Sequence, residues 1–78
     1  MTLDKRETEA VLRLLSHPDF RIFVGFLERQ AMDTNRALIF EPDTAGTAVL
    51  KGRMQVLSTL IDTIHSTPEN WTKMESKT

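Results

Sequence analysis

The fold is decided by two amphipathic stretches of sequence, FRIFVGFLERQAMDTNRAL (residues 20–38) and LKGRMQVLSTLIDTI (residues 50–64). In both stretches apolar and small side chains recur at intervals of three and four residues, the period of an α-helix packed along one side. Pro42 and Gly46 lie between the two stretches and predict a single short turn. Helices joined by so short a connection must run antiparallel. The sequence therefore predicts a helical hairpin.

The first stretch belongs to a helix that we predict over residues 17–38. An apolar flank lies beside its main face, and this flank requires a second neighbour, either another helix of the chain or another subunit. Gly25 at mid-helix costs about 1 kcal/mol relative to alanine, which close approach of another backbone or simple tolerance at the surface would explain equally. The main face comprises Phe20, Phe23, Val24, Leu27, Ala31, Thr34 and Leu38, and the flank comprises Ile22, Phe26 and Ala37.

The second stretch belongs to a helix predicted from Ala45 or Thr47 to His65. Its apolar seam alternates by four and three residues, as in a coiled coil, and further apolar residues widen the seam on one side. The seam comprises Leu50, Met54, Leu57, Ile61 and Ile64, and the widening residues are Val49, Val56 and Leu60. The residues predicted to form the deeply buried core of the hairpin are Phe23, Leu27, Leu57 and Ile61.

Three expectations concern the turn of the hairpin. Asp43 or Thr44 is predicted to cap the helix that follows, because short polar side chains accept hydrogen bonds from the first free amides. Gly46 is expected to supply a positive φ, which glycine adopts without steric cost. Ile39 and Phe40 precede the turn and are expected to be tucked beneath it.

A shorter helix is predicted over residues 3–15, with Thr2 as its cap. Glu7 interrupts its apolar strip, so we expect only partial burial there. The next four residues, SHPD, predict a break in which Ser16 caps the following helix and Pro18 occupies its first turn. The strip comprises Leu3, Ala10, Leu14 and, at its edge, Val11.

These elements predict an all-α protein of three helices, with one helical domain over residues 1–66 and a polar tail over residues 67–78. Pro68 suits the first turn of a short additional helix around Trp71. Trp71 and Met74 are the only apolar residues of the tail. A lone tryptophan there either folds back to close the end of the hairpin, the favoured interpretation, or anchors in a pocket of a partner.

Composition excludes several classes of function. The chain has no cysteine, so disulfides and thiolate metal sites are ruled out. His17 lies in a capping segment and His65 at a predicted helix end, where it would complement the helix dipole. Asp62 and His65 are three residues apart, an arrangement that predicts a solvated hydrogen bond. We therefore expect a protein that is not an enzyme and that binds no metal, cofactor or small-molecule substrate.

Charge and hydropathy indicate whether the protein binds nucleic acid or enters a membrane. The formal net charge is −1 and acids alternate with bases, so the chain as a whole lacks the basic surface typical of nucleic-acid binding. Arg21, Arg29 and Arg36 do recur along one helix and could follow a phosphate backbone. Asp33 is spaced to pair with two of them, which makes a solvated, self-neutralising face the favoured interpretation. The N-terminus has no apolar leader and no apolar run approaches the length of a membrane span, so secretion and membrane insertion are not expected.

Three features occur together over residues 14–64: PDF at residues 18–20 opens a helix, a charged hairpin turn follows, and GR at residues 52–53 precedes Leu57, Leu60 and Ile61. In these features the chain resembles small helical proteins encoded in the structural gene clusters of tailed bacteriophages. The resemblance implies a small component of the virion or of its assembly, located in the host cytoplasm or in the particle. A rival hypothesis is a regulatory or inhibitory protein that binds a host or phage macromolecule, including a nucleic-acid-binding protein.

Either hypothesis requires contact with other proteins. A domain of 78 residues without disulfides or metals gains stability most readily from a partner, so we predict a homo-oligomer or docking on a larger assembly. One short N-terminal helix can cover only part of the apolar flanks of the hairpin. The residues predicted to form the protein interface are Ile22, Phe26, Val49, Val56, Leu60 and Trp71.

Overall fold

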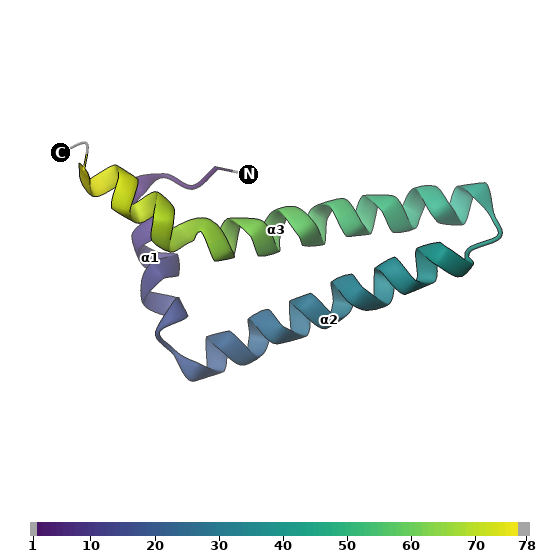
Figure 1. Ribbon diagram of the computed structural model, residues 1–78, viewed down its shortest axis with the longest axis horizontal. Coiled ribbons are helices and arrows are strands. Elements are labelled where there is room, and N and C mark those ends of the chain that lie inside the picture. The colour runs from purple at the N-terminus through teal and green to yellow at the C-terminus, as the bar shows by residue number, and fades with distance from the viewer. Residues whose placement is uncertain (1, 77–78) are drawn as a thin grey trace.

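The computed structural model describes residues 2–76 and contains three α-helices, α1 (Lys5–Leu15), α2 (Pro18–Phe40) and α3 (Thr44–Ser76). Helices α2 and α3 run antiparallel and are joined by a short turn, while α1 crosses the open end of this hairpin (Figure 1). The predictions of an all-α fold, of three helices and of an antiparallel hairpin are confirmed. The bounds of the helices and the residues that face the core differ from the prediction in several places.

Helix α1 begins later than expected because Asp4, and not Thr2, provides its cap. The carboxylate of Asp4 accepts a hydrogen bond from the amide of Glu7 at 2.7 Å, and the carboxylate of Glu7 accepts one from the amide of Asp4 at 3.0 Å. This reciprocal capping box satisfies two otherwise free amides. Glu7 is therefore occupied at the exposed helix terminus and does not interrupt a buried strip. The buried side of α1 holds Thr8, Val11, Leu12 and Leu15, whereas Leu14 is exposed.

The predicted break near Ser16 is confirmed, although Ser16 ends α1 and does not cap α2. Its hydroxyl donates to the carbonyl of Arg13 at 2.7 Å. Helix α2 starts at Pro18, and His17 at the cap position makes no capping hydrogen bond with its side chain. The missing amide hydrogen of proline is harmless at the first position of a helix. The chain therefore turns sharply between the two helices.

At the far end, α2 continues to Phe40 and the turn is only three residues long. Asp43 accepts a hydrogen bond from the amide of Ala45 at 3.2 Å, which confirms it as a cap of α3. Gly46 lies within α3, and no glycine of the described residues has a positive φ, so that expectation was wrong. An added Cβ would come within 2.7 Å of the Glu41 carboxyl carbon, which lies at the end of a flexible side chain and can move aside. Ile39 and Phe40 are 70% and 77% exposed and are not tucked under the turn, because the helix continues through them.

Helix α3 extends well past the predicted end at His65, through Pro68, to Ser76. It thus continues across the expected boundary between a domain and a polar tail. Proline inside a helix costs about 3 kcal/mol and commonly bends it, and α3 changes direction in its yellow-green C-terminal part (Figure 1). Burial offsets that cost, since Ile64 and Thr67 are buried and Trp71 is half-buried along the same side of the helix.

The core is small and lies where the three helices meet. Its buried residues are Val24, Leu27 and Ile64, against which half-buried residues such as Leu57 and Ile61 pack. Phe23 is 49% exposed, so its assignment to the deep core was wrong, and Leu57 and Ile61 are only partly buried. The buried side of α2 is centred on Val24 and Leu27, which leaves Phe23 at its edge.

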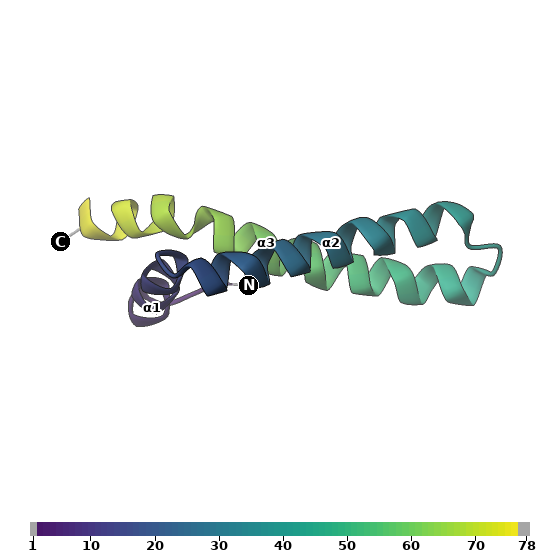
Figure 2. The ribbon, with the colours of Figure 1, turned by 90° about the horizontal axis from the view of Figure 1, so that it is seen from below.

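The molecule is a flat plate with extents of 51 × 26 × 14 Å. The molecule is thin because the two long helices lie side by side in one layer. Viewed along its edge, the hairpin is thin, and α1 lies to one side of it at the base (Figure 2). None of the helices described is both long enough and apolar enough to cross a membrane.

Candidate interaction surface

A single layer of helices has two broad faces, and the register of each helix decides which residues belong to which face. Phe26 and Glu28 are two residues apart on α2 and therefore point in nearly opposite directions, as do Val56 and His65 on α3. We call the side with Phe26 and Val56 the groove face and the side with Glu28 and His65 the His65 face. The two faces differ in chemistry.

The groove face carries a depression of about 670 Å³ between α2 and α3. Its floor is apolar, formed by buried Leu27 and half-buried Leu57, and its rims carry the exposed side chains of Phe26 and Val56. Arg53 is the only charged residue in the lining. The complete lining is Phe26, Leu27, Gln30, Thr34, Gly52, Arg53, Val56 and Leu57.

An aromatic ridge borders this groove along α2. The ring centroids of Phe20 and Phe23 are 6.3 Å apart, and those of Phe23 and Phe26 are 6.2 Å apart in a stacked arrangement. Such contacts hold aromatic rings in defined positions. Phe23 and Phe26 nevertheless remain exposed, so the groove face combines a rigid apolar projection with an apolar depression.

Burial changes along one stripe of α3 that runs the length of this face. Thr67, Leu60, Val56 and Val49 lie four or seven residues apart and so share one side of the helix. Thr67 is 1% exposed, Leu60 is half-buried, and Val56 is 64% exposed.

The cause of this gradient is α1. Its Thr8, together with Leu3 of the preceding segment, lines a small cavity with Thr63 and Thr67 at the base of α3. Helix α1 therefore packs on the base of the stripe, and Figure 2 shows it displaced to one side of the hairpin. The groove is the uncovered continuation of the surface that α1 occupies.

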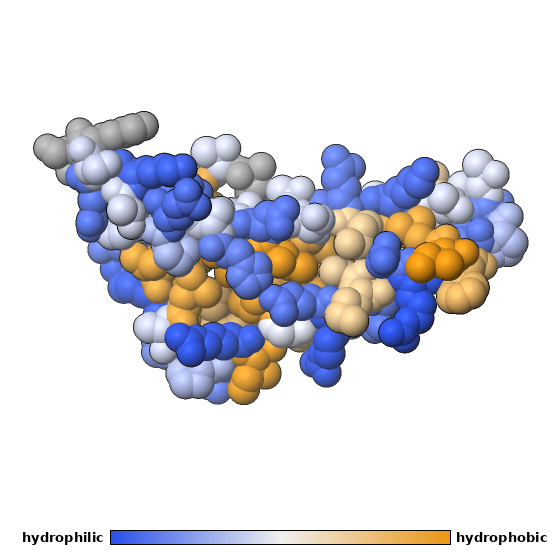
Figure 3. All heavy atoms as spheres, in the orientation of Figure 1, coloured by the Kyte–Doolittle hydropathy of each residue, from blue (hydrophilic) through white to orange (hydrophobic). Residues whose placement is uncertain are grey.

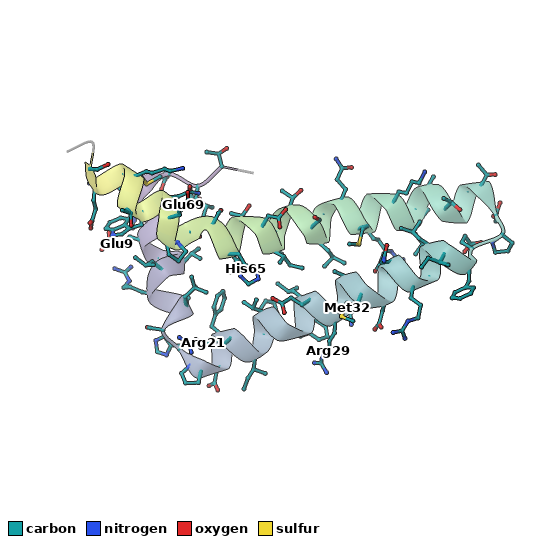
Figure 4. All side chains as sticks on the ribbon, viewed as in Figure 1. Glu9, Arg21, Arg29, Met32, His65 and Glu69 are labelled. Carbon is teal, nitrogen blue, oxygen red and sulfur yellow. The ribbon has the colours of Figure 1, made fainter. Side chains whose placement is uncertain are left out.

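The His65 face holds a polar contact between the two long helices. His65 Nε2 lies 2.9 Å from Glu28 Oε1, and Figure 4 shows the imidazole directed from α3 toward α2. The sequence predicted that His65 would lie at a helix end and contact Asp62. It lies instead in the interior of a longer helix and contacts Glu28. A pocket of about 310 Å³ beside this pair is lined by Leu15, Arg21, Val24, Gly25, Glu28 and His65.

The rest of this face is mixed in character. Apolar atoms are visible along the seam between the two long helices, with polar side chains on either side of them (Figure 3). Met32 is 63% exposed on α2 and is visible near the middle of the hairpin (Figure 4). Across residues 2–76, no group of three or more histidine, aspartate or glutamate side chains is arranged to hold a metal ion.

The three arginines considered for phosphate contact do not form an equivalent row. Arg21 Nε donates a hydrogen bond to the carbonyl of Leu15 at 3.0 Å, which ties the end of α1 to the start of α2. Arg29 extends from the middle of α2 away from α3 (Figure 4). Within the described part of the chain, no ion pair joins Asp33 to Arg29 or Arg36, so the predicted self-neutralisation is not observed.

The six residues predicted to form an interface fall into three groups. Phe26 and Val56 line the groove, and Val49 and Leu60 lie on the same stripe of α3. Ile22 is exposed at the outer edge of α2. Trp71 belongs to the continuous helix α3, where it is half-buried and lies seven residues after the buried Ile64, on the same side of the helix. That any of these residues bind a partner stays a prediction.

Sequence reasoning missed two features of the groove. Phe23 had been assigned to the core, and Gly52 attracted no attention as part of a surface. A Cβ added at Gly52 would meet nothing within 4 Å, so the monomer itself gives no reason for glycine there. An unexplained glycine beside Val49 and Val56, which widen the apolar seam, was the available signal. Comparison with protein-family models, with curated proteins and with solved structures finds no match for this chain.

Proposed function

We propose that the protein is a non-enzymatic protein–protein interaction module that docks through the groove face of its hairpin. The supporting observation is the state of the outer half of the hairpin, residues 32–56, which contains no buried side chain. Two helices in contact only with each other bury too little apolar surface for a stable hairpin. Exposed apolar surface of this extent is typical of a protein that works in contact with another protein.

A matched pair of variants tests this proposal. Val56 and Met32 are almost equally exposed, at 64% and 63%, but Val56 borders the groove and Met32 lies on the His65 face. Tagged wild-type protein should retain a partner in stoichiometric amounts from the cells that express it, including a differently tagged copy of itself. Val56→Glu should lose that partner because it places a carboxylate in an apolar contact, whereas Met32→Glu should keep it.

The proposal fails if the folded wild-type protein retains no protein at stoichiometric amounts, its own copies included. It also fails if both variants lose the partner equally, because the groove face would then have no special role. Mass spectrometry of the retained proteins gives the readout, and circular dichroism verifies that each variant is helical.

A narrower proposal concerns the biological setting, and it derives from the sequence resemblance to small helical proteins of tailed-bacteriophage structural gene clusters. In that setting the module is a component of the virion or of its assembly, and repeated copies in a purified particle would support it. The alternative is a regulatory or inhibitory protein that blocks a host or phage macromolecule. Stoichiometric capture of one cytoplasmic protein, without incorporation into particles, would favour this alternative.

A further inference from the structure

We propose that the occupant of the groove face is a second copy of this chain, packed face to face about a two-fold axis that runs across the helices. The inference rests on the proposed function and names its partner. The resulting dimer is an antiparallel pair of hairpins, so that the turn of each copy points toward α1 of the other.

The chain exposes more area than a compact monomer of its mass, and the excess is similar in size to one side of a dimer interface. A compact monomer of 8.9 kDa exposes roughly 4,800 Å², whereas this chain exposes 5891 Å². The excess is about 1,100 Å², and a standard protein interface buries about 800 Å² from each partner. Burial of a standard interface area against another copy would therefore remove most of this excess.

The groove face is also suited to contact with itself. It carries one charged residue, Arg53, in an otherwise neutral lining, and the whole chain has a formal net charge of −1. Two such faces bring together only two like charges, those of the Arg53 side chains, and the long stem of each arginine can follow the groove so that its guanidinium reaches solvent at the rim. A two-fold contact also requires that a projection and a depression occur on the same face, and here the ridge of Phe23 and Phe26 borders the groove.

The position of α1 decides the relative direction of the two copies. Helix α1 projects on the groove side at the base of the hairpin. Base-to-base stacking would force the α1 helices of the two copies into the same space. The antiparallel arrangement avoids that collision, and it leaves α1 to cover the base of each hairpin while the second copy covers the rest.

In this arrangement large side chains of α2 lie opposite small ones. With the axis at Gln30, Phe26 faces Thr34 of the second copy and Phe23 faces its Ala37, because each pair is equally spaced about position 30. The same symmetry on α3 brings the two helices closest near Gly52, with Val49 opposite Val56. The absence of a side chain at Gly52, which nothing within the monomer requires, permits that approach.

The mass of the protein in solution is the primary test. Size exclusion coupled to light scattering at tens of micromolar should give about twice the chain mass of 8.9 kDa for the wild type and for Met32→Glu. Val56→Glu should raise the dissociation constant by roughly 100-fold or more, because each copy would bury an unpaired carboxylate. A folded wild type that remains a monomer would overturn the second-copy inference. The proposed function would survive that result if the pull-down retained a different protein.

Cross-linking tests the antiparallel arrangement without any disruptive variant. The chain has no cysteine, so a single introduced thiol is unique. A short thiol-specific cross-linker should join two copies of Gln30→Cys, which lies at the axis, and should not join two copies of Ala45→Cys, which lies near the turn. Cross-linking of Ala45→Cys with none at Gln30→Cys would exclude this arrangement.

Discussion

Thr67 and Val56 lie on one stripe of α3, yet one is almost completely buried and the other is mostly exposed. The difference arises from what covers them, since α1 packs over Thr67 whereas none of residues 2–76 covers Val56 in the same way. The hydroxyl of Thr67 donates to the carbonyl of Thr63 at 2.8 Å, so the buried polar group is satisfied within the helix. A polar residue is thus at the most protected position of the stripe and an apolar residue at an open one.

At the scale of single residues, Leu27 and Phe23 should differ sharply in their contribution to stability. Leu27→Ala should lower the free energy of unfolding by about 2–5 kcal/mol, because it removes a buried side chain from a very small core. Phe23→Ala should cost only about 1 kcal/mol, mainly through its contacts with other rings. Urea denaturation of dilute protein, where association contributes least, measures both values. An equal loss for the two variants would show that the assigned core is incorrect.

At the scale of elements, α3 has two structural roles that the sequence analysis assigned to separate segments, a helix of the hairpin and a C-terminal tail. Its first half forms the hairpin with α2, and its last turns bind α1. Pro68 lies between these two parts, and the helix passes through it because both sides of the bend are packed. The short helix α1 closes the base of the hairpin and, through Arg21 and Leu15, is joined to α2.

Replacing Pro68 by alanine tests whether α3 is continuous. Alanine restores an amide hydrogen within the helix and has a much higher helix propensity, so Pro68→Ala should raise the free energy of unfolding by about 1–3 kcal/mol. Thermal unfolding followed by circular dichroism gives the measurement, with Glu69→Ala as an exposed neighbour that should change little. A clear loss of stability would show instead that the bend itself is required for the contact with α1.

At the scale of the whole molecule, the flat shape is the dominant feature. A plate one helix thick leaves two faces to be covered, and the chain provides α1 for only part of one of them. The remaining apolar surface, and not any cluster of reactive groups, is what sets this molecule apart from a compact domain of its size. We therefore expect the stability of the protein to depend on binding to another surface.

Nucleic acid is not expected to be that surface. Arg21 is engaged with the backbone of α1, and Arg29 and Arg36 lie on a helix whose other exposed residues include acids and large apolar groups. We expect no salt-sensitive shift of DNA or RNA at micromolar protein in the wild type, and none in Arg29→Gln with Arg36→Gln. A salt-sensitive shift that the double variant abolishes would contradict this expectation.

The sequence by itself determined the three helices, the antiparallel hairpin and the two apolar flanks, one with Phe26 and one with Val56, because helical period and turn chemistry are local properties. The sequence also located the break near Ser16 and the cap at Asp43, because hydrogen bonds between residues close in sequence determine both helix ends. These features follow from neighbours within a few residues along the chain.

Only the tertiary structure decided how far α3 extends and which part of each apolar stripe is covered. The continuation through Pro68 depends on packing against α1, a contact between opposite ends of the chain. The pairing of His65 with Glu28 and the exposure of Phe23 likewise depend on how the helices are rotated against each other. The helical period predicts that a stripe of side chains is apolar. Whether that stripe is buried depends on a neighbouring element, and no local sequence pattern encodes the position of that element.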